Sequence, residues 1–301
     1  MSEATVIALG FFDGVHLGHG ALLRKTAERA AQLGVTPAAF TFDRSPREFV
    51  TGTRVPLLTD AQERAALIRE LYGVERVFVA VFDRTMMTMP WRAFVTDLLV
   101  ARYHAVHLVA GYDFRFGSGN EGDCGRLRLL CRELGLGCDV IAPVEHDGVT
   151  VSSTLIRRLI EAGEVRRAAE FLGHPHRMRG SVCHGQGVGK KLLFPTANLL
   201  PAPHIITPAR GVYATRAFLD DGTSYAGVTN VGVHPTVGAG DTVTVETFLT
   251  DFSGDLYGRE LRLDFYDFLR PEQRFPSVAA LYDQISHDAA RARALVERTD
   301  G

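Results

Sequence analysis

The sequence is poor in cysteine and tryptophan, and its charges nearly cancel. Among 301 residues there are 4 cysteines and 1 tryptophan, and 33 basic residues against 35 acidic ones leave a net charge of −2. This balance argues against nucleic acid or an acidic membrane surface as the main partner. No apolar run approaches the roughly 18 residues that span a bilayer. Residues 1–5 lack the basic stretch of a secretory signal, so we expect a cytoplasmic protein.

The cysteines fit neither a zinc site nor a dense disulfide framework. Cys124, Cys131 and Cys138 recur every seven residues, and Cys183 stands alone. Zinc sites use close Cys-x-x-Cys pairs, which are missing here. We therefore predict buried or half-buried thiols, with Cys124 and Cys131 on one face of a helix.

The first part of the chain alternates strand-like and helix-like segments. A hydrophobic share of 46% and a charged share of 23% are those of a globular protein. The length predicts two domains, since one domain usually holds about 100–200 residues. The expected helices cover 21–33, 60–72 and 90–99, and alternation with strands predicts a parallel sheet with helices on both faces. The strand candidates are 6–9, 38–42, 77–81, 106–110 and 139–142.

The second part of the chain changes to a period of two, which predicts antiparallel strands. Residues 242–249 (TVTVETFL) and 261–265 (LRLDF) show this alternation, and residues 220–222 (DDG) form a hairpin signal. A helical pattern returns only at 277–296. We place the boundary so that the domains cover residues 1–174 and 175–301.

An apolar strand candidate runs into a glycine-punctuated loop that carries two histidines. Residues 10–19 read GFFDGVHLGH, and a helix that begins near His19 would point free N–H groups and its positive dipole end at an anion. Two histidines three residues apart more often lie on a helix surface or share a metal. However, Gly18 between them is a poor residue for the middle of a helix. The pattern predicts a phosphate-handling site.

This loop resembles the His-x-Gly-His signature of the nucleotidyltransferase superfamily, and the longer FDGVHLGH resembles its prokaryotic FAD synthetase branch. The resemblance implies a Rossmann-like domain in which a phosphate oxygen of FMN attacks the α-phosphorus of ATP and expels pyrophosphate. It assigns catalysis to His16 and His19. The residues that it assigns to ATP or its phosphates here are Gly10, Phe12, Asp13 and Gly18.

Two more segments resemble parts of that family. Alone, residues 111–117 (GYDFRFG) read as a surface loop with core phenylalanines, but the resemblance implies flavin contacts for Asp113, Phe114 and Arg115. Residues 151–157 (VSSTLIR) predict an ordinary helix N-cap, and the same geometry binds phosphate. The resemblance assigns phosphate contacts to Ser152, Ser153, Thr154 and Arg157.

A glycine-rich segment at 185–190 (GQGVGK) does not form a P-loop. The first P-loop glycine would fall at His184, and Lys191 occupies the Ser/Thr place, so a glycine-rich hairpin is the plain interpretation. Together with residues 194–199 (FPTANL), however, the segment resembles the riboflavin kinase motif. The resemblance implies ATP contacts for Gly185, Gly187, Gly189 and Lys190, and Mg²⁺ contacts for Thr196 and Asn198.

The strand candidate 242–249 carries a glutamate that matches the same kinase family. Most strand glutamates are merely solvated, and alternation puts Glu246 on one face with Thr244 and Phe248. The resemblance implies that Glu246 deprotonates the 5′-hydroxyl of riboflavin for attack on the γ-phosphate of ATP. It also assigns flavin contacts to Asn230 and Arg270.

The resemblance covers nearly the whole chain and implies a bifunctional enzyme. A Rossmann-like nucleotidyltransferase domain would precede an antiparallel β-barrel kinase domain with a C-terminal helix. The implied substrates are ATP, riboflavin and FMN, with Mg²⁺ as cofactor and small molecules as the partners; the sequence leaves open whether a homo-oligomer forms. Gly20, Ser45 and Leu193 depart from the family pattern. Two alternatives therefore stand, a riboflavin kinase with weak or lost adenylyltransferase activity and a non-catalytic flavin-binding regulatory protein.

Overall fold

The chain folds into two compact units, which a computed structural model describes over residues 3–183, 196–202, 204–236 and 240–298. The first unit is Met1–Ser153 and the second is Thr154–Gly301. Compactness therefore divides the chain about twenty residues before the predicted boundary between 174 and 175, which stays a prediction of where the family domains meet. Each unit is taken by itself below.

A five-stranded parallel sheet forms the centre of the first unit, as predicted. Its strands lie in the order β3-β2-β1-β4-β5, so the direction of winding reverses between β1 and β4. Loops that follow these two strands leave the sheet at the same edge, which is where open α/β sheets bind ligands. The bounds are β1 (Thr5–Leu9), β2 (Thr36–Phe42), β3 (Arg76–Ala80), β4 (Ala105–Gly111) and β5 (Gly137–Ile141).

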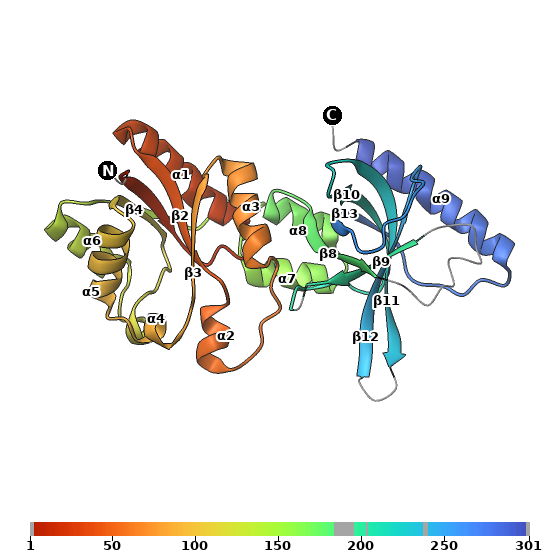
Figure 1. Cartoon of the computed structure of the whole chain (residues 1–301), viewed down its shortest axis with the longest axis horizontal. Coiled ribbons are helices and arrows are strands. Elements are labelled where there is room, and N and C mark those ends of the chain that lie inside the picture. Colours follow the sequence, from red (N-terminus) through yellow and green to blue (C-terminus); the bar gives the residue numbers. More distant parts are fainter. Residues whose placement is uncertain (1–2, 184–195, 203, 237–239, 299–301) are drawn as a thin grey trace. The chain divides into compact units, whose positions relative to one another are not determined.

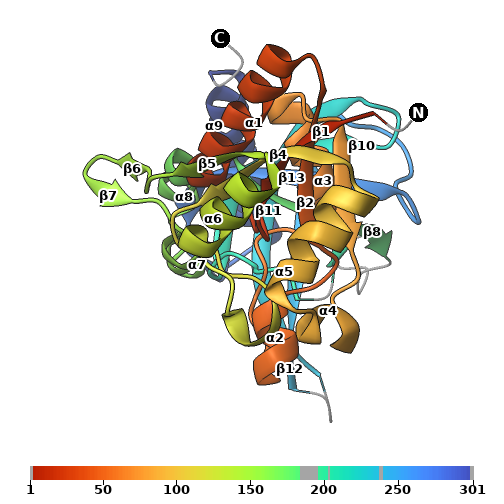
Figure 2. The same cartoon turned by 90° about the vertical axis from the view of Figure 1, so that its left-hand side faces the viewer.

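Helices cover both faces of the sheet (Figures 1 and 2). One face packs against α1 (Leu17–Leu33) and α3 (Ala61–Tyr72), and the other against α6 (Cys124–Leu134) and the π-helical η1 (Phe94–Arg102), which continues α5 (Trp91–Ala93). Helix α1 begins four residues earlier than expected, because His16 caps it. The short elements are α2 (Pro46–Thr51), α4 (Arg84–Thr88), η2 (Ser118–Asn120) and the hairpin of β6 (Glu145–His146) and β7 (Val149–Thr150).

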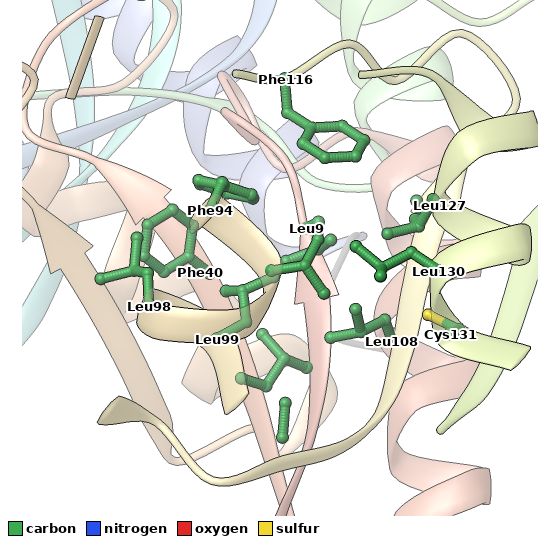
Figure 3. Packing of buried hydrophobic residues seen from close by; sticks show 14 of the residues in the cluster. Leu9, Phe40, Phe94, Leu98, Leu99, Leu108, Phe116, Leu127, Leu130 and Cys131 are labelled. Carbon is green, nitrogen blue, oxygen red and sulfur yellow. The ribbon is translucent and has the colours of Figure 1, made fainter. Parts of the chain in front are cut away.

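Alternation along β1 distributes its side chains between two cores. Leu9 packs with Phe40, Phe94 and Leu108 on one face (Figure 3). Val6, one of the intervening residues, joins the core beneath α1 and α3. Both faces of the strand are fully buried, as the continuous apolar run of a central parallel strand requires.

The second unit is a closed antiparallel barrel, preceded by two helices and followed by one, in agreement with the predicted fold class. The strands follow the order β10-β11-β12-β9-β8-β13, and the predicted turn at 220–222 joins β10 to β11. The bounds are α7 (Ser153–Glu161), α8 (Val165–Leu172), β8 (His176–Cys183), β9 (Thr196–Pro201), β10 (Gly211–Leu219), β11 (Ser224–Thr236), β12 (Gly240–Leu249), β13 (Glu260–Arg270) and α9 (Val278–Glu297).

Side chains such as Tyr213, Leu263 and Phe265 fill the barrel, while α9 packs outside it on β10, β11 and β13. Among the helices in the described ranges, none is long and apolar enough to cross a membrane. Cys131 is buried, and Cys124 and Cys138 are half-buried, as predicted. The prediction was wrong for Cys183, which is exposed because it alternates with the inward-facing Val182 at the end of β8.

Candidate active sites

The loop after β1 has a strained backbone. The N–H of Gly10 still donates to the carbonyl of Phe40, at 3.2 Å, before the chain turns away from the sheet. The turn uses positive φ angles at Phe12 (57°), Gly14 (78°) and Val15 (43°). A β-branched residue such as Val15 rarely adopts this region. Such strain persists only where the surroundings fix the backbone, and it is common at binding loops.

His16 forms the N-cap of α1. Its Nδ1 accepts the backbone N–H of His19 at 3.3 Å. A neutral imidazole that accepts at Nδ1 carries its proton on Nε2, so the donor of this ring lies opposite the cap. The ring of His19 stacks on that of His16, with 3.6 Å between centroids and 14° between planes. Gly18 permits this packing, because a Cβ there would lie 3.1 Å from the His16 ring.

His19 is held in its neutral form. Burial, followed by the charges of His16 and Arg64, lowers the pKa of His19 well below 6.5. Its ring meets the edge of Phe12, with centroids 5.2 Å apart. Among the residues that the structure describes, no group hydrogen-bonds to the buried Nδ1 of His19. The imidazole of His19 is therefore a neutral hydrogen-bonding group at physiological pH.

The buried side chains of Asp13 and Phe12 hold the loop in place. The carboxylate of Asp13 is 2% exposed and accepts the N–H groups of Leu58 at 2.9 Å and Thr59 at 3.1 Å. The ring of Phe12 is fully buried, and a Cβ at Gly10 would lie 3.0 Å from it. These side chains fix the loop, and the ATP contacts predicted for Asp13, Phe12 and Gly10 stay predictions.

The segment at 151–157 forms the predicted helix start. Helix α7 begins at Ser153, whose Oγ donates to the carbonyl of Asp13 at 3.1 Å. Both residues belong to the first unit, so this bond joins Ser153 to the histidine loop within that unit, and Ser152 is next to Ser153 in the chain. Thr154 and Arg157 belong to the second unit, and their predicted phosphate contacts stay predictions.

The loop after β4 lies at the same sheet edge as the histidine loop. Phe116 is buried in the core and stacks on the half-buried Phe114, with centroids 5.4 Å apart. Asp113 and Arg115 are exposed, so they are accessible to a ligand. The thiol of Cys124 donates to the carbonyl of Gly111 at 3.1 Å and anchors the loop from α6. Flavin contacts of this loop stay predicted.

The two departures in the first unit have local explanations. A Cβ at Gly20 would lie 2.2 Å from the hydroxyl of Tyr72, so a larger residue there requires the Tyr72 side chain to move. Ser45 is the N-cap of α2, and its Oγ accepts the N–H of Glu48 at 3.3 Å. Both residues therefore suit their own packing.

Three of the predicted kinase residues lie side by side across the barrel. Glu246 on β12 pairs with Asn198 on β9 and with Asn230 on β11. Thr247 and Val245 next to Glu246 are 0% and 1% exposed and point into the barrel, so the Asn198–Glu246–Asn230 row lies on the outer face. Thr196 shares that face of β9, two residues from Asn198.

Residues after β13 hold this row and the end of the strand. The amide of Asn230 donates to Oε1 of Glu272 at 3.0 Å, which turns the amide oxygen away from Glu272. The guanidinium of Arg270 donates to Asp288 on α9 at 2.8 Å, and Gln284 donates to the other oxygen of that carboxylate at 3.0 Å. Arg270 is thus a structural link as well as a predicted flavin contact.

Some predicted residues have no placement. Gly185, Gly187, Gly189 and Lys190, together with the departure Leu193, lie outside the described residues. Within the described residues, no group of three or more His, Cys, Asp or Glu side chains is arranged to hold a metal ion. A cation at Thr196 and Asn198 would therefore bind through hydroxyl and amide oxygens.

Sequence patterns did not identify Arg64, Glu272 and Asp288, which hydrogen-bond to residues of the loops and strands that form the two candidate sites. Arg64 lies on α3 and is 0% exposed, and Asp288 on α9 is equally buried. Charged residues are almost never fully buried unless paired, so pattern alone places them on the solvent face of a helix. For Glu272 the available signal was the predicted Arg270, two residues earlier in the chain.

Comparisons with known proteins match both units. The FAD synthetase family model matches residues 1–155, and the riboflavin kinase model matches residues 172–296. A bifunctional riboflavin kinase/FMN adenylyltransferase of Pseudomonas fluorescens is 40% identical over 291 residues, which cover 96% of this chain and 92% of that protein. The protein of the same name from Escherichia coli K12 is 35% identical over 97% of this chain and 92% of its own.

A solved structure shares the fold over almost the full length. It is the crystal structure of a protein from Streptococcus pneumoniae that is named a macrolide-efflux protein, and it superposes with a TM-score of 0.85 at 29% identity. The match covers 97% of this chain and 95% of that one.

Proposed function

This chain belongs to the family of bifunctional riboflavin kinases/FMN adenylyltransferases, and we propose that each unit carries out one of the two reactions. The second unit transfers the γ-phosphoryl group of ATP to riboflavin and yields FMN. The first unit transfers the adenylyl group of a second ATP to FMN and yields FAD and pyrophosphate. The observations that support this proposal are the stacked histidine pair at a helix start in the first unit and the Asn198–Glu246–Asn230 row in the second.

In the adenylyl transfer, an oxygen of the FMN phosphate forms a bond to the α-phosphorus of ATP as the bond from that phosphorus to pyrophosphate breaks. Negative charge grows on the α-phosphate and on the leaving group. The start of α1 and the Nε2–H of His16 would stabilise this charge, because fixed donors need no reorganisation during the reaction. His19 supports His16 by stacking and by its own neutral imidazole. Alignment supplies the rest of the rate, and no covalent enzyme intermediate is needed.

In the kinase reaction, Glu246 accepts the proton of the 5′-hydroxyl of riboflavin while that oxygen attacks the γ-phosphorus, and ADP leaves. Asn230 is suited to orient the flavin, because its bond to Glu272 fixes the direction of its amide. Glu246 lies between Asn198 and Asn230 in the register of the neighbouring strands.

The oxygens of Thr196 and Asn198 fit Mg²⁺, which prefers oxygen ligands and often takes few from the protein and the rest from nucleotide phosphates. When bound, this ion would neutralise charge on the phosphates. Both reactions consume ATP, which cells hold in the cytoplasm, so we infer that the protein acts there on small-molecule substrates.

Product analysis tests the proposal. Purified protein with riboflavin, ATP and Mg²⁺ should form FMN and then FAD, resolved by chromatography. FMN without FAD would support the alternative of a kinase that has lost its second activity. Tight flavin binding without either product would support the regulatory protein. Formation of neither, without binding, would contradict both units of the proposal.

Paired variants separate the two sites. Glu246→Gln should lower the kinase rate by about 10²–10⁴-fold, as expected for loss of a general base, and leave FAD formation from FMN intact. Glu260→Gln on β13 of the same barrel is its control. His16→Asn keeps an N-capping side chain but removes the imidazole, and should cut only FAD synthesis by about 10²–10³-fold. Its control is His104→Asn, an exposed residue whose φ of 56° asparagine tolerates.

A further inference from the structure

A buried arginine in the first turn of α3 contacts the loop that leads to the histidines. Arg64 is 0% exposed and is among the largest fully buried side chains of the chain. Its guanidinium donates from Nη1 to the carbonyl of Phe42 at 2.7 Å and to Oγ1 of Thr41 at 3.1 Å. From Nη2 it donates to the carbonyl of Thr59 at 3.3 Å. One planar group thus joins the end of β2 to the segment that precedes α3.

The same bonds reach the loop after β1. Oγ1 of Thr41 donates to the carbonyl of Phe11 at 2.8 Å, and the ring of Phe11 lies 4.1 Å from Cζ of Arg64. Oγ1 of Thr59 accepts the N–H of Gly14 at 3.0 Å. Arg64 therefore holds the loop that leads to the histidines from two directions.

The hydrogen-bond partners of this cation are all neutral. Within the described residues its acceptors are two carbonyls and one hydroxyl, and its buried Nε has no partner. The carboxylates Asp13, Asp43 and Asp60 act on it only through space. Burial lowers the pKa of Arg64 to about 10, so it is still charged at neutral pH.

A buried charge without an ion-pair partner is costly, and a neutral side chain would tie the loops together at less cost. Its charge therefore needs a reason beyond packing. The charge of Arg64 acts on His19, because it lowers the pKa of that imidazole together with burial and His16. In the described part of the chain, the buried Nδ1 of His19 also has no hydrogen-bond partner. An anion at the start of α1 would meet the field of this guanidinium from behind the imidazoles.

We propose that Arg64 is a positioning residue for adenylyl transfer, which fixes the loops after β1 and β2 and supplies a permanent positive charge behind the paired histidines. This inference rests on the adenylyltransferase function proposed above. The planar guanidinium carries several N–H donors in a fixed arrangement, which we call the fork. The fork explains why arginine occupies this position, because lysine supplies the same charge without a planar set of donors. The charge keeps His19 neutral, in the same direction as burial and as His16.

Two variants separate the fork from the charge. Arg64→Met removes both, and Arg64→Lys removes only the fork. Arg69→Met is the matched control, because Arg69 is exposed on the same helix. All are made in the full chain. We measure kcat and KM for FAD formation against pH, the rate of the riboflavin kinase reaction as an internal control, and the titration of the His19 imidazole by NMR.

For Arg64→Met we expect a fall of about 10²-fold in kcat/KM of FAD formation, an unchanged kinase rate, and a higher pKa for His19. The charged groups that set that pKa are His16 from the start of α1 and Arg64 from α3, with Asp13, Asp43 and Asp60 around Arg64. The acid limb of the pH profile should move to higher pH with the imidazole. Arg64→Lys should lower kcat/KM by about tenfold and leave the His19 titration where it is in the parent protein.

Normal FAD formation by Arg64→Met, or an unmoved His19 titration in that variant, would overturn the inference. Equal losses in both activities would also overturn it, because they would indicate a purely structural role. If Arg64→Met does not fold, Arg64→Lys still decides, since a loss no larger than that of Arg69→Met contradicts the need for the fork. A parent protein that makes no FAD refutes the proposed function instead, and the His19 titrations still test the effect of the charge.

Discussion

Breaking the ion pair between Arg270 and Asp288 should destabilise the second unit and leave the stability of the first unit unchanged. Asp288 is 0% exposed and the side chain of Arg270 is 17% exposed, at 2.8 Å. We expect Asp288→Asn to destabilise the second unit by about 3 kcal/mol, the lower end of the cost of removing one partner from a buried pair. The estimate agrees with an attraction of about 4 kcal/mol between unit charges 4 Å apart at an effective dielectric constant of 20.

The physical reason lies in what the remaining groups lose. An asparagine can accept from Arg270 or from Gln284, but its amide then meets the other donor. The end of β13 loses one of its ties to α9, with the bond from Arg291 to the carbonyl of Leu269 remaining. Glu272, two residues after Arg270, should hold Asn230 less firmly. The KM for riboflavin should therefore rise.

The assay follows each unit separately during urea unfolding. The chain has one tryptophan, Trp91, which lies in the first unit, so its fluorescence should report the same transition in variant and parent. Kinase activity reports the second unit, and far-UV circular dichroism reports both units together. Asp283→Asn, an exposed position on α9, is the control. A stability of Asp288→Asn within about 0.5 kcal/mol of that control would refute the reasoning, because surface substitutions alone reach that size.

Two further predictions concern packing and pH. Burial lowers the pKa of His176 from 6.5 to about 4, so below pH 6.5 the unfolded chain takes up a proton that the folded chain refuses. The second unit should keep its full stability above pH 6.5 and lose up to about 3 kcal/mol toward pH 4. Across that range, the melting temperature of His176→Asn should change less with pH than that of the parent protein. Gly20→Ala should lower the free energy of unfolding by about 1–3 kcal/mol, because its Cβ would lie 2.2 Å from the Tyr72 hydroxyl. Adding Tyr72→Leu should recover part of this loss in thermal denaturation. An unchanged stability of Gly20→Ala would contradict the packing.

Local patterns predicted the elements whose own sequence determines them. The central strand β1 is almost entirely apolar, and the Asp60 cap and the glycine at 73 bound α3 as expected. Patterns failed where tertiary packing decides. Helix α8 is only 8 residues long, and η1 continues α5 in a π-helical conformation that no local signal marks.

The candidate sites divide in the same way. The motifs named Asn198, Glu246 and Asn230 separately, yet their adjacency depends on the register of β12 with β9 as well as with its chain neighbour β11. The pairing of β12 with β9 is not encoded in the local pattern of either strand, because β10 and β11 lie between them in the chain. The burial of Arg64 depends likewise on contacts with β2 and with Thr59, outside its own helix.

The departure at Ser45 gains a physical meaning from Arg64. Serine carries no positive charge, and here its hydroxyl is used to cap α2. The guanidinium of Arg64 binds the carbonyl of Phe42, three residues earlier in the same segment, and keeps a positive charge close to the end of β2. A charge placed behind the loop acts on an anion through space, although it does not contact it as an imidazole would. On this reasoning the first unit does not need a basic residue at position 45 to hold a nucleotide, and its FAD synthesis should be more sensitive to Arg64 than to Ser45.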